Sequence, residues 1–203
     1  LLFEAVQKYI EYTGDYDFIK ENIYSKLEDI IENYINGIDI DNNNIYLDSD
    51  YLLVSGTENT QNTWMDVKIG DYAVTPRNGK AVEINSMWYN SLMIMASLTS
   101  KIGKKTEIKK YKELAENCRI SFNNKFYNAR RKSLYDVLGD SKIRPNQLFA
   151  LSLTYPVIDP SSEIAKNIIN TVEKKLLNKY GLKTLAKGED NYVEIYGGEP
   201  KKR

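Results

Sequence analysis

Residues 83–99 are apolar on almost every side of the helix that their spacing predicts. Such a helix has to be enclosed by other helices, because none of its faces is suited to water. The stretch that follows carries a single apolar stripe instead, which indicates an outer helix with one face in solvent. The stripe consists of Ile108, Tyr111, Ala115, Cys118 and Phe122. The chain is therefore expected to be all-α, with inner and outer helices alternating.

Two more helix pairs are predicted on either side of this one. In the first, apolar residues recur at helical spacing around a break at residues 13–17, where aspartates offer N-caps, and Gly37 is a typical stop. The third pair opens at Pro145, which suits a first helical turn, and its inner helix is expected to end near Pro156. Its outer helix is expected to end at Gly181. The sequence thus predicts three helical hairpins.

Long polar loops separate the predicted hairpins at residues 38–80 and 127–143. Long structured loops in a compact helical protein usually carry function. Both loops lead from an outer helix to the next inner helix, so we expect them to lie at a common end of the assembly. Within the first loop, residues 45–47 and 51–54 have the composition of short strands.

Composition excludes several classes of function. Lys plus Arg and Asp plus Glu number 28 each, so no overall charge attracts the chain to nucleic acid or to an anionic membrane. The sequence contains no His, which rules out Ser-His-Asp and Cys-His catalysis and the common zinc sites within it. The Asp-rich segments 39–44 and 48–50 lack the spacing of an EF-hand. No metal or cofactor is expected, and any chemistry must depend mainly on carboxylates.

Cys118 is expected to be a buried structural thiol, because it lies on an apolar stripe and has no second cysteine to pair with. A reducing compartment, the cytoplasm, is the expected location. No segment has the length and apolarity of a membrane span. The chain opens as the interior of a helix and residues 196–203 read as a loop, so we expect residues 1–203 to be a fragment of a longer protein.

The motif Thr63-Trp64-Met65-Asp66 is the best candidate for the centre of a functional site. Flat aromatic faces cover the apolar C–H side of a sugar ring, while carboxylates, amides and guanidinium groups bind its hydroxyls. Asp66 is the candidate general acid, with Trp64 and Met65 as apolar neighbours that raise the pKa of its carboxyl. The alternative is that Asp66 caps a turn and that Trp64 belongs to the core.

Further candidates lie near the starts of the inner helices. Arg77 is expected to bind sugar hydroxyls or to pair with Glu83 and Asp66, although helix capping alone would explain Glu83. Trp88 faces either the core or a cavity, and Asn90 is hard to place in a core because a buried amide needs partners. Polar residues at the start of the third inner helix are either ligand contacts or caps. The candidate substrate-binding residues are Trp64, Arg77, Glu83, Trp88, Asn90, Arg144 and Asn146.

Six motifs follow one another along most of the chain: Thr63-Trp64-Met65-Asp66, Thr75-Pro76-Arg77, Val82-Glu83-Ile84-Asn85, Trp88-Tyr89-Asn90, Arg144-Pro145-Asn146-Gln147 and Gly181-Leu182-Lys183-Thr184-Leu185. In these motifs and in their order, the chain resembles the amylo-alpha-1,6-glucosidase domain of glycogen debranching enzymes. The resemblance implies a glucoamylase-like (α/α)6 toroid of six helical hairpins, of which residues 1–203 supply about half as one partial domain.

The resemblance also implies inverting hydrolysis of α-1,6-linked glucose at branch points of glycogen or a limit dextrin, with Asp66 as the general acid. The general base would belong to a more C-terminal part of the toroid, so residues 1–203 alone are expected to be inactive. If the base lies within them, Glu83 and Asp136 are the first carboxylates to examine. The expected partner is an α-glucan, with no nucleic acid and no membrane.

Two alternatives to this function stay open. The first is another glucoamylase-like hydrolase or a phosphorylase, and a phosphorylase needs an anion site that the sequence does not display. The second is a non-catalytic helical scaffold or glycan-binding module.

Overall fold

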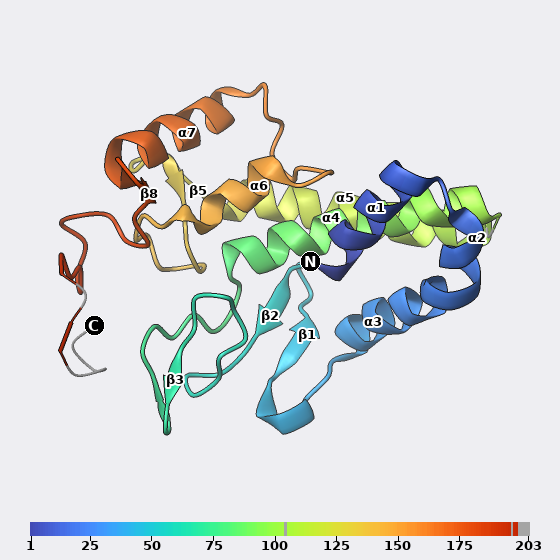
Figure 1. The fold of residues 1–203 in the computed structure, drawn as a ribbon, viewed down its shortest axis with the longest axis horizontal. Coiled ribbons are helices and arrows are strands. Elements are labelled where there is room, and N and C mark those ends of the chain that lie inside the picture. The colour runs from blue at the N-terminus through green and yellow to red at the C-terminus, as the bar shows by residue number, and fades with distance from the viewer. Residues whose placement is uncertain (104, 196, 199–203) are drawn as a thin grey trace.

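The structure, a computed structural model, describes residues 1–103, 105–195 and 197–198. Its longest helices are α4 (Val82–Ile102) and α5 (Lys105–Phe126), which lie side by side along the molecule (Figure 1). The prediction of a helical fold is confirmed. The described residues do not close into a ring, and the (α/α)6 toroid that the resemblance implies is not seen among them. Most of the loop expected at residues 196–203 lies outside the described residues.

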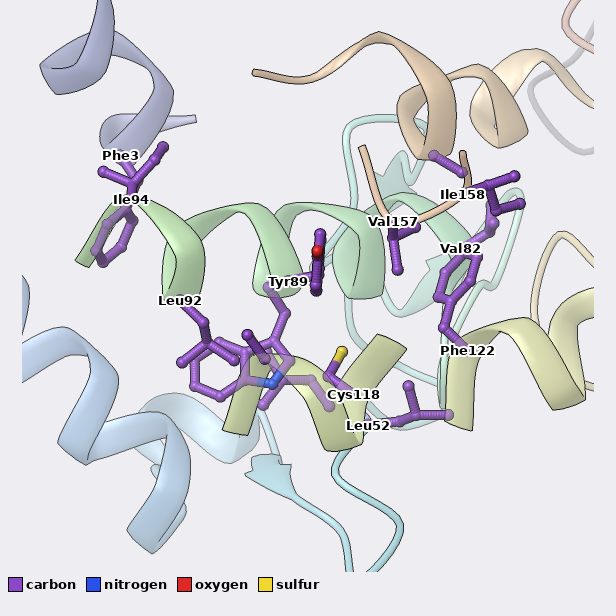
Figure 2. Close-up of a cluster of buried hydrophobic side chains, with 14 of the residues drawn as sticks. Phe3, Leu52, Val82, Tyr89, Leu92, Ile94, Cys118, Phe122, Val157 and Ile158 are labelled. Atoms are coloured by element: carbon purple, nitrogen blue, oxygen red, sulfur yellow. The ribbon is translucent and has the colours of Figure 1, made fainter. Parts of the chain in front are cut away.

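Helix α4 is enclosed, as its apolar sequence predicts. Leu92, Ile94 and Met95 are all 0% exposed although they point to different sides of the helix. Figure 2 shows α4 side chains meeting those of α5 and of the loop around Leu52. Helix α5 contributes one buried face, formed by Tyr111, Ala115, Cys118 and Phe122. The distinction between inner and outer helices therefore holds for this pair.

The first predicted hairpin contains α1 (Leu2–Thr13), α2 (Tyr16–Phe18), the π-helical segment η1 (Ile19–Ile23) and α3 (Tyr24–Asn36). The break between its helices has the expected chemistry: Gly14 has a left-handed φ of 67° and the Asp15 side chain accepts a hydrogen bond from Phe18 N at 2.9 Å. Both sides of the hairpin pack on α4.

The third hairpin is shorter than expected. Its inner part consists of η3 (Pro145–Leu148) and α6 (Phe149–Ser152), and the helix ends before Pro156 because Leu153 is already extended. Its outer helix α7 (Glu163–Leu176) is capped by Ser162, whose Oγ accepts from Ala165 N at 3.1 Å. The predicted end of this helix at Gly181 is wrong, because the chain enters a small β-hairpin directly after Leu176.

Short antiparallel β-hairpins follow each of the outer helices α3, α5 and α7. The first confirms the strand at residues 45–47, and it is preceded by the 3-10 turn η2 (Ile40–Asn42). A further hairpin lies in the loop before α4. The pairs are β1 (Ile45–Leu47) with β2 (Leu53–Ser55), β3 (Lys68–Ile69) with β4 (Tyr72–Ala73), β5 (Tyr127–Asn128) with β6 (Ser133–Leu134), and β7 (Leu177–Asn178) with β8 (Gly181–Leu182).

The long loops meet at one end of the helices, as predicted. Leu138 N donates to Lys80 O at 3.1 Å, and Val82 N donates to Asp136 O at 2.9 Å. Ala186 N donates to Ile143 O at 3.1 Å, which joins the segment after β8 to the same region. In Figure 1 this end lies to the left, opposite the turn between α4 and α5.

Cys118 is fully buried, and burial raises the pKa of its thiol, with the charge of Asp50 acting in the same direction. Because the thiolate is the reactive form, we expect the folded protein to resist alkylation at Cys118 by iodoacetamide, and the unfolded protein to react fully. Mass spectrometry of the Cys118 peptide measures this. Fast alkylation under native conditions would contradict the placement.

Among the residues that the structure describes, no helix is both long and apolar enough to cross a membrane.

Candidate functional site

Arg77 is the centre of a buried polar cluster where the long loops meet. It is 3% exposed, and its Nη2 donates to Glu83 Oε2 at 2.6 Å while Nη1 donates to the other oxygen of Glu83. Its Nε donates to Asp136 Oδ2 at 2.7 Å, and Nη1 also donates to Thr63 Oγ1 at 3.1 Å. Burial opposes the charge of Arg77, but the two carboxylates outweigh burial and raise its pKa. The guanidinium is therefore a permanent, fully engaged cation.

Local structure explains how this cluster is positioned. Glu83 lies in the first turn of α4, where the free N–H groups of the helix favour a carboxylate. Asp136 follows β6 in the loop after α5, and Arg77 lies in the loop before α4. The expected pairing of Arg77 with Glu83 is present, and the further pair with Asp136 fixes the two long loops to each other.

Asn146 joins this cluster directly, and Trp64 is connected to it through Asn146. Asn146 is fully buried and its Nδ2 donates to Asp136 Oδ1 at 2.8 Å. Its Oδ1 accepts from Trp64 Nε1 at 3.0 Å, while the indole as a whole is 59% exposed. Trp64 is thus anchored by its nitrogen with much of its surface in solvent. The alternative that placed Trp64 in the core is wrong.

Asp66 combines a turn contact with an unsatisfied oxygen. Its Oδ2 accepts from Thr63 N at 3.1 Å, and its backbone N donates to Thr63 O at 3.2 Å, so it does cap a turn. Its Oδ1 is buried and accepts no hydrogen bond from the described residues. Burial raises the pKa of the carboxyl, against the lowering effect of Thr63 and of the charge on Arg77. A raised pKa is a property that a general acid needs.

A hollow of about 1120 Å³ lies beside the cluster. Trp64, Arg77 and Arg144 line it, whereas Asp66 and Asn146 do not. Arg144 Nη1 donates to Thr184 O at 3.2 Å, and Arg144 Nε lies 3.4 Å from Asp136 Oδ2. The other lining residues are Met65, Val67, Ile69, Tyr72, Val74, Thr75, Pro76, Asp140, Lys142, Asn178, Lys183, Thr184, Leu185, Asn191, Tyr192, Val193 and Glu194.

The remaining candidates, Trp88 and Asn90, lie in the interior. Trp88 is 3% exposed and its ring meets that of Tyr34 edge-on at 6.2 Å. Asn90 has the partners that a buried amide needs: its Nδ2 donates to Glu4 Oε2 at 2.8 Å and its Oδ1 accepts from Tyr155 N at 2.9 Å. Neither residue lines the cavity. Their contacts join α4 to α3, to α1 and to the segment after α6.

Two parts of the site were not anticipated from the sequence. Asp136 is the partner of Arg77, Asn146 and Arg144, a role that nothing in its local sequence indicates. The β3–β4 hairpin supplies one wall of the cavity. Here a signal was present, because Gly70-Asp71 between alternating apolar residues is typical of a two-residue hairpin turn.

Within the described part of the chain, no group of three or more His, Cys, Asp or Glu is placed to hold a metal ion. The hollow is instead lined by an exposed indole and by side chains that carry N–H donors, and the buried carboxyls lie outside its lining. This set of groups suits a neutral, hydroxyl-rich ligand with apolar ring faces.

Comparison with known proteins identifies a family for the chain. No curated protein matches the chain. Residues 1–203 match the protein family described as amylo-alpha-1,6-glucosidase. The match spans the whole sequence, so the chain belongs to the amylo-alpha-1,6-glucosidase family.

Proposed function

We propose that this chain is the acid-bearing part of an inverting glycosidase that removes α-1,6-linked glucose from branch points of glycogen or a limit dextrin. The observation that carries the proposal is Asp66, a carboxyl with a buried, unsatisfied oxygen and a raised pKa, next to an exposed indole in a glucosidase-family chain. A glycosidase needs one carboxylic acid that protonates the leaving oxygen.

The other carboxyls of the cluster are less suited to that role. Glu83 and Asp136 each accept hydrogen bonds from Arg77 through both oxygens, which leaves neither free to approach a substrate. In the proposal they hold Arg77 and the loops in place. Asp66 does not line the cavity, so its carboxyl has to approach the leaving oxygen as substrate binds, a tightening that is common between free and bound active sites.

Trp64 and Arg144 are the proposed substrate contacts. The indole of Trp64 covers the apolar face of a glucose ring, and Arg144 donates to its hydroxyls. Asn146 acts by holding Trp64 Nε1. Trp88, Glu83 and Asn90 have structural partners and are proposed to support the site from within the core.

The second carboxylate is proposed to come from a more C-terminal part of the family's domain. There it would complete an (α/α)6 toroid of which the three helical pairs described here form about half. A cytoplasmic location and an α-glucan partner are parts of the same proposal.

One observation favours a second candidate, a phosphorylase. The structure brings Lys142, Arg144 and Lys183 to the same cavity, although they are scattered in the sequence. Basic groups gathered in this way are what a phosphate nucleophile requires. Lys142 pairs with Asp140 at 3.3 Å and Arg144 lies 3.4 Å from Asp136, so two of the three charges are partly compensated, and hydrolysis is preferred.

The test is a product assay of the full-length protein with a branched limit dextrin, with and without inorganic phosphate. We expect free glucose in both cases, released first as the β-anomer when followed by NMR, because an inverting enzyme reverses the α-configuration. Residues 1–203 alone are expected to release none. Glucose 1-phosphate as the product would establish the phosphorylase, and the absence of any product from the full-length protein would leave a binding module.

A further inference from the structure

The β3–β4 hairpin presents an apolar face to the cavity. Ile69 and Tyr72 are opposite each other in its register, and Val74 N donates to Val67 O at 2.8 Å. Because side chains alternate along a strand, Val67, Ile69, Tyr72 and Val74 share one face of the hairpin, and all four line the cavity. The opposite face carries Ala73, which is 7% exposed.

This face is open to solvent in the part of the chain that the structure describes. Val67 is 54% exposed, Ile69 is 43% exposed and Tyr72 is 41% exposed. In Figure 1, β3 extends away from the helices on the lower left, at the end where the loops meet. Neighbouring exposed apolar residues in a hollow are typical of a binding surface.

The rest of the cavity indicates what binds there. Hydrogen-bonding side chains line it beside the hairpin, among them Lys142, Arg144, Asn178, Lys183 and Asn191. An apolar peptide segment would take these groups out of water and offer them few new hydrogen-bond partners, which is costly. A glucan offers both apolar ring faces and hydroxyls. The volume of about 1120 Å³ exceeds the roughly 300–1,000 Å³ of a pocket for one drug-sized ligand, so a chain of sugars fits better than a single glucose.

We infer that the face formed by Val67, Ile69, Tyr72 and Val74 binds the α-glucan chain to which the branch glucose is attached. The inference depends on the proposed function and adds a chain-binding subsite to it. Trp64, two residues before the proposed acid, and this hairpin line the same cavity. Tyr72 therefore sets affinity for the chain and takes no part in bond cleavage.

The test compares Tyr72→Ala with Tyr72→Phe in the full-length protein. Calorimetry gives the Kd for maltoheptaose, and kinetics give KM for a branched dextrin and kcat for α-glucosyl fluoride, which has no chain. Tyr72→Ala is expected to weaken maltoheptaose binding and raise the dextrin KM about three- to tenfold, the scale of one aromatic contact. Its kcat for the fluoride should be unchanged, and Tyr72→Phe should stay near the wild type.

Two further variants test whether the effect is specific to this face of the hairpin. Ile69→Gln, on the same face, is expected to act in the same direction as Tyr72→Ala. Tyr12→Ala removes a tyrosine that is 88% exposed on α1, and it should change nothing. If Tyr72→Ala and Ile69→Gln lower the unfolding midpoint but leave maltoheptaose binding intact, another protein segment covers the face and the inference is wrong.

The inference and the proposed function can fail separately. A wild-type protein that hydrolyses dextrin with a KM insensitive to Tyr72→Ala would overturn the subsite and leave the glucosidase standing. A wild-type protein that releases no glucose, but whose maltoheptaose binding is weakened by Tyr72→Ala, would support the subsite and overturn the glucosidase.

Discussion

Replacing Asp66 by Asn in the full-length protein is expected to lower kcat on a branched dextrin by about 10²- to 10⁴-fold, the contribution of a general acid. The amide keeps the shape of the carboxyl and can still accept the bond from Thr63 N, so the fold and glucan binding should be preserved. It cannot donate the proton that the leaving oxygen requires. Steady-state kinetics and maltoheptaose calorimetry on the same sample separate the two effects.

α-Glucosyl fluoride is the control substrate for this variant. Fluoride leaves with little protonation, so the loss for Asp66→Asn should be far smaller on this substrate than on dextrin. Asp29→Asn, an exposed aspartate on α3, is the matched control variant and should lose nothing. An equal fractional loss on both substrates would show that Asp66 only positions the sugar.

The pH dependence of Asp66 gives a second signature of the same role. Burial raises the pKa of its carboxyl, so the protonated form persists to higher pH than in an exposed aspartate. Activity that needs this proton is present below the raised pKa and is lost as pH rises through it. The carboxyl also contributes stability that is complete below the pKa of the unfolded chain and is lost over the same rise. Asp66→Asn should remove both dependences.

Sequence periodicity was sufficient for the features that depend on local contacts and on burial alone. The enclosure of α4, the buried Cys118 and the turn capped by Asp15 all follow from side-chain spacing and from capping chemistry. The end of α6 did not follow, because Tyr155 N bonds to Asn90, a residue 65 positions earlier. The spacing of neighbouring residues does not reveal a contact between residues so far apart in the sequence.

In the candidate site, too, local chemistry could be predicted from the sequence and distant contacts could not. The chemistry of Trp64 and Asp66 made them candidates, but the sequence could not separate the exposed Trp64 from the buried Trp88, since both are indoles near carboxylates. What separates them is the bond from Trp64 to Asn146, 82 residues later, and the ring contact of Trp88 with Tyr34. Likewise, the pair of Arg77 with Asp136 spans 59 residues.

Removal of the Arg77 charge is expected to have the largest effect on stability. Arg77→Met leaves Glu83 and Asp136 buried without their cation, and breaking a buried pair in this way typically costs about 3–5 kcal/mol. For 203 residues that unfold as one unit the loss corresponds to a fall of roughly 6–20 °C in the unfolding midpoint, and a larger cooperative unit would show a smaller fall. Differential scanning calorimetry of the domain measures it.

Arg119→Met provides the control for Arg77→Met, because it removes an arginine that pairs with Glu116 at 2.6 Å on the surface of α5. Exposed pairs contribute only about 0–1 kcal/mol, so this variant should unfold near the wild type. Adding Glu83→Gln to Arg77→Met removes one of the stranded charges and should restore part of the lost stability, a coupling that a double-mutant cycle isolates. If Arg77→Met were no worse than Arg119→Met, the buried cluster would not be what holds the two long loops together, and the position of Asp66 and Trp64 would need another explanation.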